Sequence, residues 1–169
     1  MGKVTNVILA GLGGQGVIKA SDMLADAALR AGLDVKKAEV HGMSQRGGSV
    51  TSDVRFGEKV LSPMVPRGEA DFLVVLAPSE IEVTRPLLRP GGVLIPPDFV
   101  VEAALPNKRS LNVALLGALS HRLAIPPDAF LAAIKAALPE RLHELNERAF
   151  ALGRSAALLA FAGAEEVAP

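Results

Sequence analysis

Hydrophobic and polar positions along the 169-residue chain fall into two patterns, short apolar runs and longer stretches with helical spacing. Residues 7–10, 72–76 and 93–95 are continuous apolar runs, which are typical of strands buried on both faces of a sheet. Residues 17–31 carry apolar side chains at helical spacing and end at Gly32, a residue suited to a helix C-cap. Further helices are predicted over residues 79–88, 111–123, 126–137 and 144–162.

The region after the first helix departs from a regular alternation of strands and helices. Residues 34–40 predict a second strand, so residues 7–40 form a strand–helix–strand unit with a right-handed parallel crossover. The next connection, residues 41–48, is shorter than a helical crossover needs. Residues 50–56 alternate as a half-buried strand does, and a turn at Gly57-Glu58 predicts an antiparallel hairpin with residues 59–62.

These elements predict a single α/β domain over residues 1–169. We expect a Rossmann-like three-layer fold with a mostly parallel, mixed sheet, an antiparallel hairpin and a helical C-terminal third. Residues 164–169 are expected to form a frayed tail.

Composition and charge narrow the function. The chain has 6 Phe and neither Tyr nor Trp, which disfavours the aromatic stacking used to bind single-stranded nucleic acid. Lys plus Arg and Asp plus Glu number 18 each, so no net field attracts nucleic acid or an anionic membrane. Neutral charge with 50% hydrophobic residues instead favours a surface that another protein covers.

The absence of Cys excludes thiolate ligands for an iron–sulfur cluster, disulfides and a thiol nucleophile. Three His residues at 41, 121 and 143 are too scattered to predict a metal site. Neither a signal peptide nor an apolar stretch of membrane-spanning length is recognised, so a cytoplasmic location is expected.

The first candidate motif is the glycine loop, Gly11-Leu12-Gly13-Gly14-Gln15-Gly16, between the first strand and its helix. Glycines allow a ligand to approach the backbone, and N–H groups at a helix start favour a phosphate or carboxylate. Three readings stay open, namely a bound dinucleotide, another anion and tight packing alone. Glu39 lies where a dinucleotide-binding domain keeps its ribose carboxylate, whereas Lys19 is expected to be solvated.

The second candidate motif is the connection from His41 to Gly48. Arg46 is a bidentate donor for carboxylate or phosphate, and Gly47-Gly48 can turn backbone N–H groups toward the same ligand. His41 can exchange a proton or act as a neutral hydrogen-bond partner. Both motifs follow the carboxyl ends of presumed parallel strands, so they are expected to converge on one ligand edge. The alternative is that Arg46 braces the loop and His41 caps a strand.

Polar residues in the predicted helices have simpler interpretations. Asn112 and Asn146 are predicted to hydrogen-bond a loop or a partner, and His121 and His143 to pack partly buried.

Three ordered motifs together resemble the γ-type domain of the 2-oxoacid:ferredoxin oxidoreductases. They are the glycine loop, Arg46-Gly47-Gly48 before an alternating strand, and the late run Asn146-Glu-Arg-Ala-Phe-Ala-Leu-Gly153. The form of residues 41–48 is similar to the indolepyruvate branch, and the resemblance spans residues 4–155.

The resemblance implies the small (β) subunit of a heteromeric enzyme that converts an arylpyruvate to an aryl-acetyl-CoA and passes two electrons to ferredoxin. It implies that this chain alone binds no cofactor, with thiamine diphosphate and the iron–sulfur clusters on a larger α subunit. His41 and Arg46 would then support catalysis. The residues expected to line the active site or the coenzyme A path are Gly11, Gly13, Gly14, Gln15, Gly16, Gln45, Arg46, Gly47 and Gly48. A free-standing NAD-binding oxidoreductase and a non-catalytic assembly subunit are the alternatives.

Overall fold

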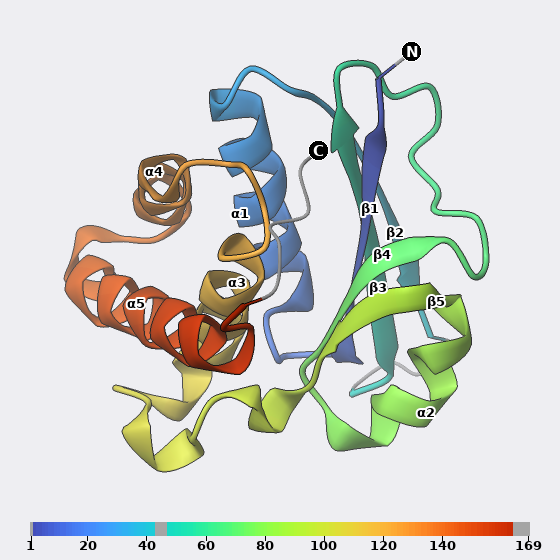
Figure 1. The fold of residues 1–169 in the computed structure, drawn as a ribbon. Helices are drawn as coiled ribbons and strands as arrows, with labels where there is room; N and C mark the ends of the chain where they lie inside the picture. Colours follow the sequence, from blue (N-terminus) through green and yellow to red (C-terminus); the bar gives the residue numbers. More distant parts are fainter. Residues whose placement is uncertain (1, 43–46, 164–169) are drawn as a thin grey trace.

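The computed structural model describes residues 2–42 and 47–163, and within these ranges five strands form one sheet. The strands are β1 (Val4–Leu12), β2 (Asp34–His41), β3 (Ser49–Gly57), β4 (Ala70–Val75) and β5 (Leu88–Ile95). The helices are α1 (Val17–Arg30), α2 (Ile81–Thr84), α3 (Leu111–Ser120), α4 (Pro127–Ala137) and α5 (His143–Ala160). The strands lie in the order β2-β3-β1-β4-β5 (Figure 1).

The sheet is mixed, as the sequence predicts. β4 runs parallel to both β1 and β5, whereas β3 runs antiparallel to both β1 and β2. β1 and β2 therefore point the same way, as a parallel crossover requires, but β3 lies between them. The antiparallel hairpin is the β2–β3 pair, and the short connection that joins it leaves no room for a helix.

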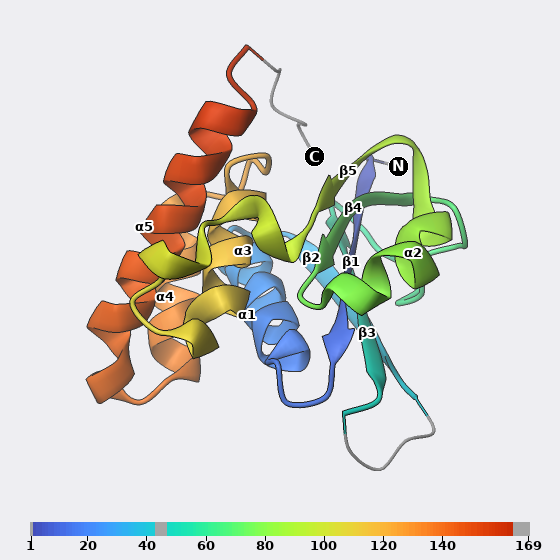
Figure 2. The ribbon, with the colours of Figure 1, turned by 90° about the horizontal axis from the view of Figure 1, so that it is seen from below.

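Helices α1, α3, α4 and α5 cover one face of the sheet, and both views show them together (Figures 1 and 2). The large core on that face includes Leu9 and Phe72, whereas Ile8 and Leu73 belong to a smaller cluster on the other face. Adjacent residues of β1 and β4 thus enter opposite cores, which explains their continuous apolar runs. The smaller cluster also contains Val65 and packs against Ile81 of α2, so the fold has three layers.

The predicted hairpin strand at residues 59–62 is wrong. The segment between β3 and β4 is irregular, because polar side chains bond its backbone in place of a neighbouring strand. Asp34 Oδ2 accepts a hydrogen bond from Val60 N at 2.7 Å, and Arg55 Nη1 donates to Ser62 O at 2.9 Å. The side chains that make these bonds belong to β2 and β3 and not to the segment itself. The pattern of residues 59–62 therefore does not reveal them.

The helix predicted over residues 79–88 is also largely wrong. Only the four residues of α2 are α-helical, and a short 3-10 turn, Arg85–Leu87, follows them. Pro86 lacks the N–H that would continue the helix. β5 then begins at Leu88 and carries Pro90 through an irregularity in its register with β4, which an edge strand tolerates. Helices α1, α4 and α5 agree with their predicted ranges within two residues, and α3 ends three residues early.

Helices α3 and α5 cross at two glycines, which gives the late sequence motif a structural role. A Cβ added to Gly153 of α5 would lie 1.7 Å from Ala114 O of α3. A Cβ added to Gly117 of α3 would lie 2.1 Å from Phe150 O of α5. Each glycine therefore admits the backbone of the other helix, and the motif that ends at Gly153 sets the distance between the two helices.

Asp53 on β3 is a buried carboxylate that supports the irregular segment. It is 7% exposed, and its Oδ2 accepts a hydrogen bond from Val65 N at 2.9 Å. Burial is the largest influence on this group and raises the pKa of Asp53 above its ordinary value of 3.8. The folded state therefore holds this proton more tightly than the unfolded chain does.

The linkage predicts a pH effect for Asp53→Asn. The stabilising contribution of the protonated group is complete below its unfolded pKa and is lost as pH rises through the raised folded pKa. The unfolding free energy of the native chain should therefore fall relative to that of Asp53→Asn as pH rises through this window, and the difference should be constant above it. Urea unfolding of both proteins from pH 3.5 to 8 measures the difference. A difference that moves the opposite way would contradict the assignment.

Candidate functional site

The glycine loop turns the chain from the end of β1 into α1. Gly14 and Gly16 adopt positive φ angles of 91° and 81°, a left-handed conformation that side chains with a Cβ rarely adopt. Gly16 is the N-cap of α1 and provides no side-chain cap, so backbone N–H groups form the start of the helix. A Cβ on Gly16 would also lie 2.5 Å from Asn112 Nδ2, so both the conformation and the packing require glycine there.

Gln15 holds the loop in this shape. Its Oε1 accepts a hydrogen bond from Leu12 N at 2.8 Å, and its Nε2 donates to Leu76 O at 3.3 Å. The side chain thus joins the carboxyl ends of β1 and β4. A Cβ on Gly11 would lie 2.8 Å from Val17 Cγ2 and 3.2 Å from Leu76 Cβ, so the packing beside Gln15 favours the first glycine of the motif.

The two glycine motifs lie side by side at the carboxyl end of β1. Gly13 N donates a hydrogen bond to Gly48 O at 2.9 Å, and Gly47 adopts a positive φ of 65°. A Cβ on Gly13 would lie 3.4 Å from Gly47 N, so the backbones approach closely. Direct backbone contacts thus bring the glycine loop and Gly47-Gly48 together, as expected. Gln45 and Arg46, which the sequence also assigns to this site, lie outside the described residues.

A cavity of about 480 Å³, the glycine-loop cavity, opens beside the loop. It lies between the start of α1 and the segment that leads into α3. Its lining residues are Gly14, Gln15, Gly16, Leu76, Lys108, Arg109, Leu111 and Asn112. Two cations and a helix N-terminus border it, and no acidic residue is among these lining residues, so the cavity favours an anion.

Sequence reasoning missed Lys108 and Arg109. They lie in a 3-10 turn, Lys108–Ser110, that Asn107 caps by accepting a hydrogen bond from Arg109 N at 2.8 Å. Lys108 Nζ lies 3.1 Å from Glu102 Oε1, and both side chains are exposed. An Asn-capped turn ahead of a predicted helix is a recognisable signal. Its position against the glycine loop depends on how α3 packs, which local sequence does not give.

His41 lies on the other side of the glycine loop. It lines a cavity of about 380 Å³, the His41 cavity, together with Gly13, Val17 and Lys19. Its Nε2 lies 3.7 Å from Glu39 Oε2, and the side chain is 62% exposed. His41 thus borders the start of α1, as the sequence predicts, at the end of β2.

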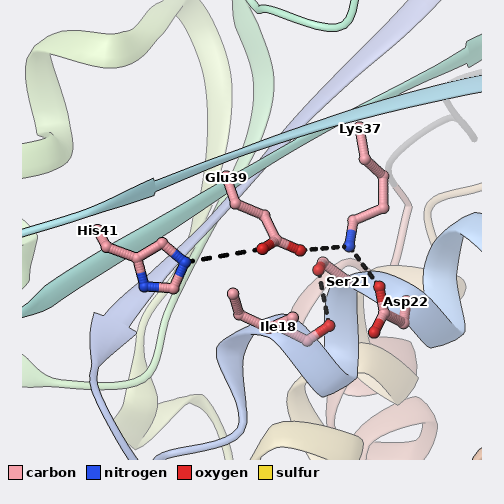
Figure 3. A network of polar contacts seen from close by, with 6 residues as sticks. All are labelled: Ile18, Ser21, Asp22, Lys37, Glu39 and His41. Atoms are coloured by element: carbon pink, nitrogen blue, oxygen red, sulfur yellow. Dashed lines mark hydrogen bonds and ion pairs between the residues drawn. The ribbon is translucent and has the colours of Figure 1, made fainter.

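Glu39 belongs to a chain of charges on β2 and α1 (Figure 3). Lys37 Nζ donates to Glu39 Oε1 at 3.0 Å and also bonds Asp22 of α1. The hydrogen bond from Lys37 is the largest influence on Glu39 and lowers the pKa of Glu39. Figure 3 shows the carboxylate between Lys37 and His41. This pairing, with β3 between β2 and β1, separates Glu39 from the position of a ribose-binding acid beside the glycine loop.

The polar residues of the helices have mostly structural contacts. Asn112 Nδ2 donates to Gly16 O at 3.2 Å, and Asn146 Nδ2 donates to Leu142 O at 2.9 Å, as expected for structural amides. His143 Nε2 lies 2.7 Å from Leu138 O. Lys19 is exposed, and its Nζ donates to Ala137 O at 3.4 Å, near the C-terminal end of α4.

The described residues include neither a cluster of metal-ligating side chains nor a helix that could span a membrane. Residues 2–42 and 47–163 contain no group of three or more His, Asp or Glu side chains placed to hold a metal ion. In the same ranges no helix combines the length and the apolar character needed to cross a membrane.

The fold and the glycine motifs place the chain in a known class of oxidoreductase. The model of the family described as pyruvate ferredoxin/flavodoxin oxidoreductase matches residues 6–106, and the chain belongs to this family. The indolepyruvate oxidoreductase subunit IorB of Thermococcus kodakarensis is 36% identical over 197 aligned positions, covering 92% of this chain and 96% of the relative. The subunit of the same name from Pyrococcus horikoshii is 33% identical with the same coverage.

Solved structures confirm the fold. The γ subunit of a keto/oxoacid ferredoxin oxidoreductase from Geobacter sulfurreducens gives a TM-score of 0.77 at 24% identity and covers 94% of this chain and 98% of that one. The 2-oxoglutarate:ferredoxin oxidoreductase of Magnetococcus marinus, with 2-oxoglutarate, coenzyme A and succinyl-CoA bound, gives 0.80 at 21% identity. That match covers 99% of this chain and 32% of the Magnetococcus chain. The resemblance drawn from the three motifs is therefore confirmed.

Proposed function

We propose that this chain is the small subunit of an indolepyruvate-type 2-oxoacid:ferredoxin oxidoreductase and that it is active only with a larger subunit. The observation that carries the proposal is full-length similarity to indolepyruvate oxidoreductase subunits, 36% identical over 96% of the relative's length. The proposed reaction is oxidative decarboxylation of an arylpyruvate to an aryl-acetyl-CoA, with ferredoxin as electron acceptor. The large core contains residues from β1 through α5, which supports one γ-type domain over residues 1–169.

Iron–sulfur clusters and metal-bound thiamine diphosphate do not fit the residues of this chain. The sequence has no Cys to hold an iron–sulfur cluster, and the described residues offer no cluster of carboxylates and His for the metal of a diphosphate cofactor. We therefore place thiamine diphosphate and the clusters on the larger subunit. Thiamine diphosphate would supply the decarboxylation chemistry there.

The contribution of this chain is to bind and orient an anion. The start of α1 presents backbone N–H groups beside the glycine-loop cavity, and Arg109 lines the same cavity with its planar, two-pronged donor group. Either the carboxylate of the oxoacid or a phosphate of coenzyme A matches these donors. In the complex, the Arg46 loop would complete this surface, and His41 would orient Arg46 or hold a proton at its ring nitrogen.

Activity measurements on the lone chain and on the complex test the proposal. The purified chain should show no arylpyruvate-dependent reduction of ferredoxin or of a viologen dye, whereas the complex with its larger subunit should reduce either acceptor only when coenzyme A is present. Indolepyruvate, phenylpyruvate and pyruvate assayed side by side give the substrate preference. Appreciable activity of the lone chain, or a complex that oxidises no 2-oxoacid, would overturn the proposal.

A further inference from the structure

A second cavity, the arginine cavity, lies behind the glycine-loop cavity, between α1, α3 and the start of α5. It has a volume of about 350 Å³. Its polar lining residues are Lys19, Asn107, Arg109, Ser110, Arg141, Asn112 and Asn146, and its apolar ones are Met23, Val113, Leu138, Leu142 and Leu145. We propose that the arginine cavity is a binding site for a phosphate group.

The cations of this cavity come from three separate elements. Lys19 is on α1, Arg109 is in the turn before α3, and Arg141 is in the 3-10 turn Glu140–Leu142 before α5. None of the residues that line the cavity is acidic. Among the residues that the structure describes, neither arginine forms an ion pair with a carboxylate. The whole chain has equal numbers of acidic and basic residues, so this excess of positive charge is local.

The walls of the cavity are fixed by internal hydrogen bonds. Asn112 and Asn146 are 8% and 7% exposed, and both amides bond to backbone carbonyls. Ser110 Oγ donates to Asn107 O at 2.5 Å. These bonds hold the start of α3 and the start of α5 in place around the cavity. The exposed side chains of Arg109 and Arg141 line this ordered, concave surface rather than a flat patch, which favours a small ligand over a protein surface.

The chemistry of these donors favours phosphate. Two guanidinium groups offer paired N–H donors to the tetrahedral oxygens of a dianion, a geometry that one carboxylate fills less completely. The start of α3 borders the same cavity through Ser110, Asn112 and Val113. Lys19 adds a third positive charge. Its ammonium group has three N–H donors, and the weak bond to Ala137 O uses one of them, which leaves two for a ligand.

Arg109 and Asn112 line both the arginine cavity and the glycine-loop cavity. Because the two cavities share this wall, one ligand can extend into both of them, and the phosphate group can therefore come from either of two sources. It is either one end of a ligand whose other anionic group occupies the glycine-loop cavity, or a separate phosphorylated molecule. The inference rests on the arginine cavity itself and goes beyond the proposed reaction, so it can be tested without any turnover.

Titration of the full chain with inorganic phosphate, followed by ¹⁵N-resolved NMR, tests the proposal. The backbone amides of Ser110, Val113 and Asn146 should shift in a saturable way. Arg141→Gln should weaken phosphate binding by about tenfold, because it removes a charge-assisted hydrogen bond. The matched control is Arg148→Gln, since Arg148 is exposed on α5 and is not among the residues that line the cavity. Circular dichroism checks that both variants are folded.

A second titration uses fructose 1,6-bisphosphate, which carries two phosphate monoesters on one molecule. Binding more than tenfold tighter than inorganic phosphate, with added shifts at Gly14 and Gly16, would support the proposal in its bridging form. Equal affinities with shifts confined to the arginine cavity would support a separate phosphate ligand. No saturable shift at the three amides, or equal phosphate affinity in Arg141→Gln and Arg148→Gln, would overturn the proposal. An Arg141→Gln chain that loses only its binding to the larger subunit would also overturn it.

Discussion

Gly153→Ala is expected to lower the melting temperature of the chain by about 6–12 °C, which corresponds to roughly 3 kcal/mol. The added methyl group would lie 1.7 Å from Ala114 O and 2.8 Å from Ala118 N, both backbone atoms of α3. Backbone cannot rotate away as a side chain can, so α5 must move away from α3 and lose packing along the crossing. The higher helix propensity of Ala, about 1 kcal/mol, offsets only part of this cost.

Ser155→Ala on the same helix is the matched control, because Ser155 is exposed and the change also favours helix. Thermal unfolding followed by circular dichroism at 222 nm compares the two variants with the native chain. The control should unfold within about 2 °C of the native chain, since an exposed substitution changes stability by about 0.5 kcal/mol or less. A Gly153→Ala chain as stable as the control would contradict the close crossing of α3 and α5.

Features encoded by local sequence were predicted well. The run at residues 7–10, the glycine loop and the helix that follows each show their pattern within a few consecutive residues. The structure confirms that element order, and it places Gly13 against Gly48 as the convergence of the two motifs requires. Gly14 and Gly16 are constrained by their own backbone angles, which is why the sequence shows them so clearly.

Features that depend on long-range contacts were predicted poorly. The irregular segment after β3 is held by Asp34, Asp53 and Arg55, and no periodicity in residues 59–62 shows those bonds. Arg109 is another such case, because it reaches the site through the packing of α3 against the glycine loop. Most of the fold was therefore accessible from the sequence, whereas the positions of Lys108 and Arg109 beside the glycine loop were not.

Arg109→Gln in the complex is the second change expected to have a large effect. Arg109 borders both the glycine-loop cavity and the arginine cavity. It is the one cation that the lining residues of the two cavities share. Its loss removes a charge-assisted hydrogen bond worth about 1.5–3 kcal/mol. The KM for coenzyme A or for the arylpyruvate should therefore rise by about 10- to 100-fold. Lys59→Gln, an exposed change in the irregular segment, serves as the control.

The split between KM and kcat separates the functional readings. A residue that binds the anion equally in the ground and transition states raises KM and leaves kcat nearly unchanged. The substrate whose KM rises also identifies the ligand, because coenzyme A and the oxoacid are varied independently. Size-exclusion chromatography of the variant complex shows whether the subunits remain associated, so that a loss of assembly is not read as a loss of binding.

The most direct test of anion binding by this subunit is the steady-state kinetics of the intact complex carrying Arg109→Gln. The expected result is a KM raised at least tenfold for one anionic substrate, with kcat within about twofold and the complex intact. An intact complex with unchanged KM values for both coenzyme A and the arylpyruvate would show that Arg109 binds neither anion and would contradict the anion-binding role proposed for this surface.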